Sequence, residues 1–155
     1  MDILLVEDEA PKQERILSFL QDNWPFANVR TARSVRSAIQ QLCTQRPDLI
    51  LLDVSLPTFD VGPNETGGRP QNFGGVEVLR YMDLYEQIVP TIVVTAYEAF
   101  SKNGQAIDHR SLDNQLSQDH PNSYRGLIYY NSLFSEWRTI LEEAIAAQIG
   151  QRKGS

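Results

Sequence analysis

The chain has 155 residues, of which 14 are basic and 20 acidic, so its net charge is −6. This length suits one domain with a full hydrophobic core, and the negative charge argues against sequence-independent nucleic-acid binding, which requires a basic surface. No apolar run approaches the roughly eighteen residues that a membrane helix needs, and no basic leader precedes the first apolar run, so we expect a cytoplasmic protein without a membrane partner. The single cysteine, Cys43, excludes an internal disulfide, and its apolar helical neighbours predict a buried thiol.

The first half of the chain alternates short apolar runs with helical patterns. Pro11 suits the first turn of a helix, and Ser34 suits the cap of the next one. The aliphatic residues 49–52 lie between two prolines and predict a strand that is buried on both faces, and therefore central in a parallel sheet. The expected elements are strands over 2–6, 28–32 and 49–52 and helices over 11–23 and 35–46.

The second half begins with a glycine- and proline-rich segment, residues 58–75, which has no periodic apolar pattern and predicts a long loop that is either functional or disordered. Residues 97–124 are polar and fit no clear pattern apart from one short helix. The expected elements are a helix from Val76 that ends before Pro90, a strand over 91–94, a helix over 111–119, a strand over 126–130 and an amphipathic helix that begins near Leu133.

Five strands that alternate with five helices predict an α/β fold: a doubly wound, five-stranded parallel sheet with helices on both faces and right-handed crossovers. The pattern shows no internal repeat and no linker to a second domain. We expect one domain over residues 1–150, followed by a frayed tail over 151–155. The last helix should present one apolar face, made of Leu133, Trp137, Ile140, Leu141, Ala144 and Ile145.

Acidic residues follow two of the expected strands. Asp53 comes directly after the central strand, at the edge where open α/β sheets place their ligands, and Glu7 and Asp8 follow the first strand. If these strands are neighbours, the three carboxylates converge and attract a hard divalent cation. The strand over 91–94 delivers Thr95 to the same edge. Alternatively, the acids near residue 8 merely cap the first helix, and Thr95 is an ordinary residue at a strand end.

Four motifs in this order resemble the receiver domain of two-component response regulators (CheY-like). They are Leu4-Leu5-Val6-Glu7-Asp8-Glu9, Leu51-Leu52-Asp53 with Pro57 four residues later, Gly75-Val76-Glu77-Val78-Leu79, and Val94-Thr95-Ala96. The resemblance extends from residue 2 to about residue 149 and implies a flavodoxin-like strand order, 2-1-3-4-5. It also implies that a histidine kinase or phosphotransfer protein phosphorylates Asp53, and that the domain signals through a downstream protein partner.

The resemblance assigns roles to individual residues. Because a carboxylate that attacks a phosphoryl donor brings two negative charges together, a bridging cation is needed. Mg²⁺ prefers few carboxylates together with other oxygen ligands, which suits Asp8 and Asp53 directly, Glu7 through water and the backbone carbonyl of Ser55. The Thr95 hydroxyl is expected to bond the phosphoryl group and to reposition the following loop.

One position departs from the family pattern. The family carries a lysine at the end of the fifth strand, whereas Tyr130 falls at that position here. A neutral hydroxyl lacks the strength of a charge-assisted hydrogen bond. The candidates to replace the missing charge are Lys12 and Lys102, and the aromatic residue that moves with the threonine in many receivers is replaced by Leu127.

Two hypotheses follow. The first is a stand-alone, atypical receiver that is phosphorylated on Asp53 with Mg²⁺ and acts through protein contacts. The second is a phosphorylation-independent pseudo-receiver, an interaction module that has kept the fold. An enzyme of another class is disfavoured, because related magnesium hydrolases carry a second aspartate where this chain has Ser55. The sequence leaves open the kinase, the output partner, a homodimer, and the roles of residues 58–75 and 97–124.

Overall fold

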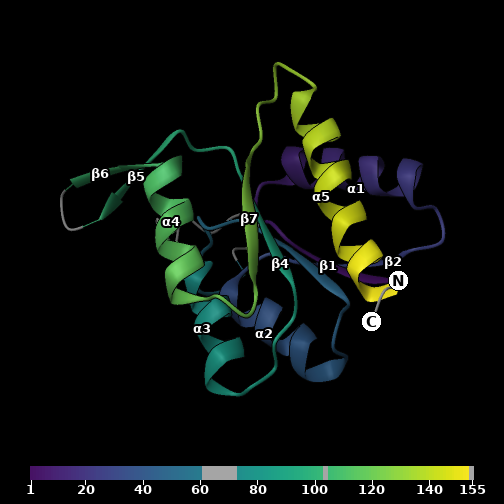
Figure 1. Cartoon of the computed structure of the whole chain (residues 1–155), viewed down its shortest axis with the longest axis horizontal. Helices are drawn as coiled ribbons and strands as arrows, with labels where there is room; N and C mark the ends of the chain where they lie inside the picture. The colour runs from purple at the N-terminus through teal and green to yellow at the C-terminus, as the bar shows by residue number, and fades with distance from the viewer. Residues whose placement is uncertain (61–72, 103–104, 154–155) are drawn as a thin grey trace.

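A parallel sheet of five strands forms the centre of the molecule in the computed structural model, which describes residues 1–60, 73–102 and 105–153 (Figure 1). Its order is β2-β1-β3-β4-β7, and every neighbouring pair is parallel. The strands are β1 (Asp2–Val6), β2 (Asn28–Ala32), β3 (Leu49–Leu52), β4 (Thr91–Thr95) and β7 (Tyr124–Tyr129). Since β7 is the fifth strand of this sheet, the expected order 2-1-3-4-5 and the doubly wound fold are confirmed.

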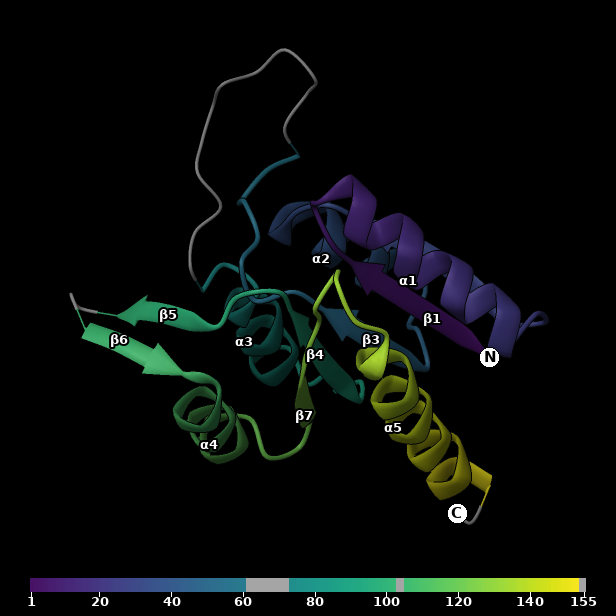
Figure 2. The ribbon, with the colours of Figure 1, turned by 90° about the horizontal axis from the view of Figure 1, so that it is seen from above.

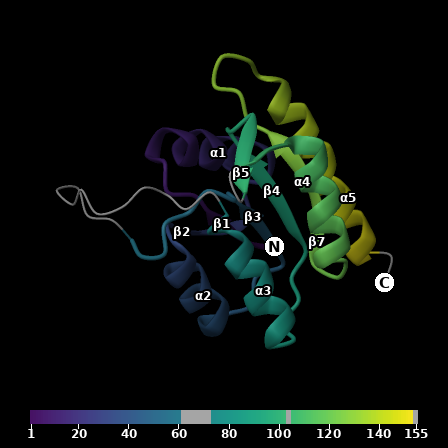
Figure 3. The same cartoon turned by 90° about the vertical axis from the view of Figure 1, so that its left-hand side faces the viewer.

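Helices cover both faces of the sheet (Figure 2). Over the described ranges they are α1 (Ala10–Asn23), α2 (Val35–Thr44), α3 (Val76–Leu84), α4 (His109–Asp119) and α5 (Glu136–Lys153). The helices α1 and α5 pack on one face, and α2, α3 and α4 pack on the other. Figure 3 shows α2 and α3 side by side on their face. No helix in the described part of the chain is long and apolar enough to cross a membrane.

The central strands are buried on both faces, as their unbroken apolar runs predict. In β1, Leu4 and Val6 face the α2–α3–α4 side, whereas Ile3 and Leu5 face the α1–α5 side. The strand β3 alternates in the same way. Because both faces are filled with side chains, the carboxyl-terminal edge of the sheet is left as the place where polar groups gather.

The C-terminal helix buries most of the face that its sequence predicts. The buried stripe consists of Trp137, Leu141 and Ile145, which recur every fourth residue and were all expected there. Two other expected residues are not part of it: Leu133 precedes α5 and is 83% exposed, and Ile140 is half exposed. The helix also continues through Lys153, so residues 151–153 of the expected tail are helical, and 154–155 lie outside the described residues.

The position of the cysteine was also predicted wrongly. Cys43 is exposed, and its sulfur lies 3.0 Å from the hydroxyl oxygen of Tyr81. The buried positions of α2 are Val35, Ala38 and Leu42, so the next residue after Leu42 is turned away from the core.

The polar region that follows β4 contains a small second sheet that was not expected. The strands β5 (Ala99–Lys102) and β6 (Gln105–Asp108) form an antiparallel hairpin that does not join the main sheet and projects beside α4 (Figures 1 and 2). The helix α4 begins two residues earlier than expected, because the Asp108 carboxylate accepts a hydrogen bond from the Ser111 N–H and caps the helix.

Two glycines fix the end of the long loop to the chain that follows β3. The Gly75 N–H donates to the Val54 carbonyl at 2.7 Å. A Cβ atom on Gly74 would lie 2.1 Å from the Leu56 carbonyl oxygen, and one on Gly75 would lie 2.2 Å from the Asp53 carbonyl oxygen. Only glycine permits this close backbone approach. The residues 61–72 of the expected loop lie outside the described residues.

Candidate functional site

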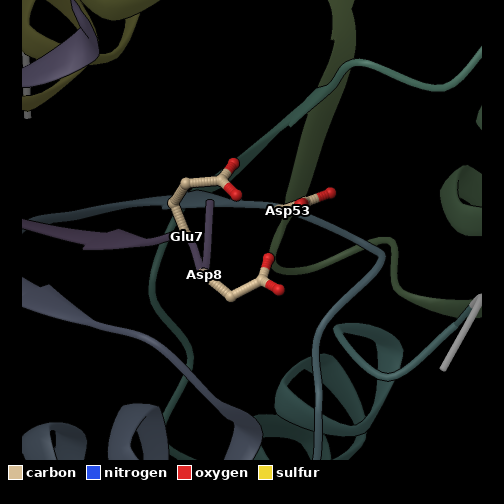
Figure 4. A group of neighbouring side chains, drawn as sticks. All are labelled: Glu7, Asp8 and Asp53. Carbon is tan, nitrogen blue, oxygen red and sulfur yellow. The ribbon is translucent and has the colours of Figure 1, made fainter. Parts of the chain in front are cut away.

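Three carboxylates meet at the carboxyl-terminal edge of the sheet, where β1 and β3 end (Figure 4). The register pairs Val6 with Leu52, and the Asp53 N–H donates to the Val6 carbonyl at 3.0 Å. Ligand oxygens of Glu7, Asp8 and Asp53 lie within 4.8 Å of one another. The structure therefore brings together the acids that the sequence analysis placed at this edge.

The burial of this cluster changes the protonation of its acids. Burial raises the pKa of Asp53 to about 8, against the opposing effect of the nearby Lys12 ammonium. Burial, reinforced by the Glu7 carboxylate, raises the pKa of Asp8 to about 6. A carboxylate removed from water loses hydration and is disfavoured in its ionised form unless a cation stands near it. The cluster thus favours a bound cation.

The donor set suits Mg²⁺, a hard cation that takes oxygen ligands. The Ser55 N–H donates to Asp53 Oδ1 at 3.1 Å, which fixes one carboxylate oxygen, and the buried Ser55 hydroxyl has no hydrogen-bond partner among the described residues. Both oxygens of Glu7 are engaged, one by the Glu9 N–H at 3.0 Å and the other by Lys12. The carboxylates of Asp8 and Asp53 are therefore the ones that fit direct contact with an ion.

Thr95 lies at the end of β4 and is fully buried. Its hydroxyl oxygen accepts a hydrogen bond from the Tyr97 N–H at 3.2 Å, and its carbonyl accepts one from the Tyr130 N–H at 2.7 Å. Because the hydroxyl acts as an acceptor in this contact, its own proton is free to be donated elsewhere. The residue thus ties the start of the β4–β5 connection to the end of β7.

Lys12 places an ammonium group inside the carboxylate cluster. It extends from the first turn of α1 and is 2% exposed. Its Nζ lies 2.5 Å from Glu7 Oε1, 2.8 Å from the Val94 carbonyl oxygen and 3.7 Å from Asp53 Oδ2. Burial alone would lower the pKa of this ammonium, but the carboxylates of Asp53 and Glu7 outweigh that effect and hold its pKa above the ordinary value.

Tyr130 lies directly after β7 and is buried. Its ring centroid lies 5.8 Å from Lys12 Nζ and 5.0 Å from the ring centroid of Trp137. Leu127, by contrast, packs against the core on the opposite face of the sheet. Lys102, the second candidate for the missing charge, belongs to the β5–β6 hairpin, and its side chain lies outside the described part of the structure.

Sequence reasoning identified the three acids, Thr95 and Tyr130, and named Lys12 as one of two candidates for the missing charge. It did not find the Val94 carbonyl that accepts from Lys12, or the contact between Lys12 and the Tyr130 ring. A main-chain acceptor leaves no signal in a sequence. A lysine on an otherwise apolar stripe does leave one, since Lys12 precedes Ile16 by one helical turn.

The strand order and the acids at the ends of β1 and β3 define a flavodoxin-like α/β domain with an acidic site at the carboxyl-terminal edge of its sheet. A family model described as the response regulator receiver domain matches residues 3–114, and the chain belongs to that family. It is thus a receiver domain of two-component signal transduction.

Two relatives match almost the whole chain. The Detocs response regulatory protein DtcB of Enterobacter cloacae is 25% identical over 147 residues, which cover 94% of this chain and 98% of that protein. The uncharacterized protein y4jR of Sinorhizobium fredii is 24% identical over 146 residues, which cover 93% of this chain and 96% of that protein. The similarity extends over the C-terminal region, beyond the residues that the family model matches.

Solved structures of low sequence identity share the fold. The signal receiver domain of a putative Luxo repressor protein from Vibrio parahaemolyticus has a TM-score of 0.69 and 19% identity, covering 98% of this chain and 92% of that chain. A CheY-like receiver domain protein from Methanospirillum hungatei has a TM-score of 0.65 and 17% identity, covering 99% of this chain and 98% of that chain.

Proposed function

We propose that this receiver domain accepts a phosphoryl group on Asp53, with Mg²⁺ bound beside it, and signals by a change in protein contacts. The observation that carries the proposal is the convergence of Glu7, Asp8 and Asp53, whose ligand oxygens lie within 4.8 Å of one another. Asp8, Asp53 and the Ser55 carbonyl would hold the ion, and Glu7, whose oxygens are engaged by Lys12 and the Glu9 N–H, would add its negative charge. The domain has no enzymatic output of its own in this proposal.

The phosphotransfer step is a displacement at phosphorus. The phosphodonor is a phosphohistidine of a histidine kinase or of a phosphotransfer protein. A carboxylate oxygen of Asp53 forms the new O–P bond while the N–P bond of the donor breaks and its electron pair returns to the imidazole. Bound Mg²⁺ supplies neutralisation of the charge that gathers on the transferring group. The Ser55 N–H orients the attacking carboxylate through its hydrogen bond to Oδ1.

Thr95 couples the modified site to a neighbouring segment. Its hydroxyl moves towards the phosphoryl group and donates a hydrogen bond to a phosphoryl oxygen. This movement weakens the hydrogen bond that the hydroxyl accepts from the Tyr97 N–H. The segment that begins at Tyr97 leads into the β5–β6 hairpin, which lies outside the main sheet. A shift in this segment changes the surface that a downstream protein meets.

The partners in this proposal are proteins. A histidine kinase or phosphotransfer protein supplies the phosphoryl group, and a downstream protein reads the state of the domain. The Enterobacter cloacae relative is named as a response regulatory protein, which supports this assignment. The net charge of −6 disfavours direct nucleic-acid binding. We place the protein in the cytoplasm, where kinases supply phosphohistidine, and homodimer formation forms no part of the mechanism.

Phosphorylation can be tested with a small phosphodonor. Incubation of the chain with acetyl phosphate and Mg²⁺ should add the mass of one phosphoryl group, and peptide mapping should locate it at Asp53. The Asp53→Asn variant and a reaction with EDTA serve as controls and should both stay unmodified. A wild-type chain that gains no mass from acetyl phosphate, and whose spectrum does not change with trifluoroberyllate and Mg²⁺, would contradict the proposal.

A pseudo-receiver is the second candidate, and one observation favours it: Tyr130 stands where the family carries its lysine. In that case the domain binds its partner regardless of phosphorylation. The two candidates separate once a partner is captured, because Asp53→Asn leaves binding unchanged in a pseudo-receiver and locks a phosphorylation-dependent receiver in one state.

A further inference from the structure

We propose that Lys12, which extends from α1, is the cationic group that binds the phosphoryl group on Asp53, and that Tyr130 is a positioning residue that holds the Lys12 ammonium in place. This inference rests on the proposed function, because it names the protein group that recognises the modified aspartate. The resemblance implies a lysine at the end of the last strand of the sheet. The inference places the corresponding positive charge on α1 instead.

The charge balance of the site requires a cation from the protein. The cluster already contains the carboxylates of Glu7 and Asp8, and a phosphoryl group on Asp53 adds roughly two negative charges. One divalent ion cannot balance this total. In the described part of the chain, Lys12 is the residue whose charged nitrogen lies within 4.0 Å of an Asp53 oxygen. The ammonium therefore stands where the additional negative charge arises.

The hydrogen bonds of Lys12 leave one donor for a ligand. An ammonium group has three N–H donors. One is directed to Glu7 Oε1 at 2.5 Å and one to the Val94 carbonyl at 2.8 Å. The nearest further oxygen in the described ion pairs, Asp53 Oδ2, lies at 3.7 Å, which is too long for a hydrogen bond. A phosphoryl group on Asp53 brings anionic acceptor oxygens next to this third donor.

Lys12 occupies a position on α1 where burial of its charge costs free energy, which indicates that the ammonium has a role in the site. The buried stripe of α1 continues from Lys12 through Ile16, Phe19 and Leu20. A charged group on an apolar stripe loses hydration, and a buried ion pair adds little net stability over an apolar replacement. Packing alone would be served by an aliphatic side chain at this position.

Tyr130 places its ring close to the Lys12 ammonium and restricts the position of that ammonium. Its ring lies 5.8 Å from Lys12 Nζ, a distance at which the electron-rich face attracts a cation, and Trp137 supports the ring at 5.0 Å. A second lysine at position 130 would bring a like charge against Lys12. The aromatic residue at this position and the lysine at position 12 therefore form a matched pair.

Substitution of Lys12 tests the inference with two ligands of opposite charge. In the full chain, Lys12→Met removes the charge and keeps the length of the side chain. Trifluoroberyllate binding in the presence of saturating Mg²⁺ should weaken by about tenfold or more, the loss of one charge-assisted hydrogen bond. Mg²⁺ binding alone should be at least as tight as in wild type, because a competing positive charge has been removed. Arg15→Met, which removes an exposed cation from the same helix, should change neither affinity.

Variants at position 130 test the positioning role. Tyr130→Phe keeps the ring and should bind trifluoroberyllate like wild type, whereas Tyr130→Leu should weaken that binding and leave Mg²⁺ binding unchanged. The double variant with Lys12→Met and Tyr130→Lys moves the charge to the strand and should recover trifluoroberyllate affinity. A purely structural Lys12 predicts instead that the Lys12→Met variant loses affinity for both ligands together.

A measurement on the unmodified chain does not depend on the folding of any variant. The chain contains three lysines, at positions 12, 102 and 153. With ¹⁵N-labelled lysine, the protected ammonium signal of buried Lys12 should shift when trifluoroberyllate joins the Mg²⁺-bound protein. A signal that stays in place, or a Lys12→Met variant with wild-type trifluoroberyllate affinity, overturns the role of Lys12 but leaves the proposed function intact. Failure of the wild-type chain to bind trifluoroberyllate overturns the proposed function itself.

Discussion

At the residue scale, the central feature is a set of three neighbouring acids, of which Glu7 and Asp53 are buried and Asp8 is half-buried. Asp53 and Asp8 both have a raised pKa, to about 8 and about 6, and burial is the main cause for each. A raised carboxyl pKa means that the folded state disfavours the ionised form. The ionised carboxylates are therefore electrostatically unfavourable in the folded protein, and a bound cation would stabilise them.

The stability of the protein without Mg²⁺ should consequently depend on pH. The unfolded Asp53 carboxyl ionises near its ordinary pKa of 3.8, whereas the folded one ionises near 8, so the folded state binds more protons between these values. Its contribution to stability is fully present below pH 3.8 and is lost as the pH rises towards 8. In Mg²⁺-free buffer at pH 8, Asp53→Asn should raise the free energy of unfolding by about 1 to 2 kcal/mol.

Urea denaturation of wild type and Asp53→Asn at pH 5 and pH 8, with and without Mg²⁺, measures this effect. The advantage of the variant should shrink at the lower pH, and Mg²⁺ should stabilise wild type more than the variant. A wild-type chain that gains stability relative to Asp53→Asn as the pH rises, in the absence of Mg²⁺, would show that the carboxylate is not destabilised by burial.

At the scale of elements, the junction between the Asp53 segment and α3 depends on backbone contact. Gly75 lies against the Asp53 carbonyl and Gly74 against the Leu56 carbonyl. This contact holds the first turn of α3 against the segment that carries Asp53 and Ser55. The position of the Asp53 carboxylate thus depends on a helix that contributes no side chain to the carboxylate cluster.

Gly75→Ala should therefore be destabilising. The added Cβ atom would lie 2.2 Å from a backbone oxygen, so the segment must shift, at a cost of about 1 to 3 kcal/mol. The matched control is Gly150→Ala in α5, where a Cβ atom meets nothing within 4 Å. That change should stabilise by about 0.5 to 1 kcal/mol, because alanine favours a helix. Thermal unfolding of both variants, followed by Mg²⁺ titration of Gly75→Ala, decides whether the junction also shapes the site.

At the scale of the whole molecule, the five-stranded sheet and the β5–β6 hairpin differ in how they are stabilised. The five-stranded sheet is packed on both faces by two hydrophobic clusters, whereas the β5–β6 hairpin pairs only with itself. A two-stranded hairpin is only marginally stable alone. The core is thus suited to hold the carboxylate cluster rigidly, whereas the hairpin is held less firmly.

Hydrogen exchange should reveal this difference. The amides of β5 and β6 should exchange at least about a hundredfold faster than those of β1 and β3, because the hairpin forms a separate two-stranded sheet that can open while the main sheet stays intact. Exchange measured by mass spectrometry on the full chain gives both rates in one experiment. Equal protection of the hairpin and the central strands would contradict this division of the molecule.

The sequence predicted the sheet well because its central strands are buried on both faces and leave unbroken aliphatic runs. It failed for the hairpin over 99–108, whose strands are short and lack such a run. The start of α5 was predicted wrongly because Leu133 is apolar but exposed, so its periodicity did not reflect burial. Periodicity indicates which residues are able to be buried, and tertiary packing decides which of them are.

The candidate site was predictable to the extent that it depends on strand ends. Glu7, Asp8 and Asp53 could be brought together because parallel strands deliver their last residues to one edge. The sequence could not decide between Lys12 and Lys102 as the source of the positive charge. The position of the Lys12 ammonium depends on the conformation of its side chain and on its hydrogen bond to the Val94 carbonyl. This hydrogen bond joins residues that are 82 positions apart in the chain.

Both ends of the 58–75 segment are held by main-chain hydrogen bonds. The Thr58 carbonyl accepts from the Arg36 N–H at 3.1 Å, and the Gly75 N–H donates to the Val54 carbonyl at 2.7 Å. With the anchors fixed, doubling the length between them costs only about 0.6 kcal/mol of closure entropy. Insertions or deletions between these two anchors can therefore leave the carboxylate cluster undisturbed, which makes this segment a natural place for chains of this family to diverge in length.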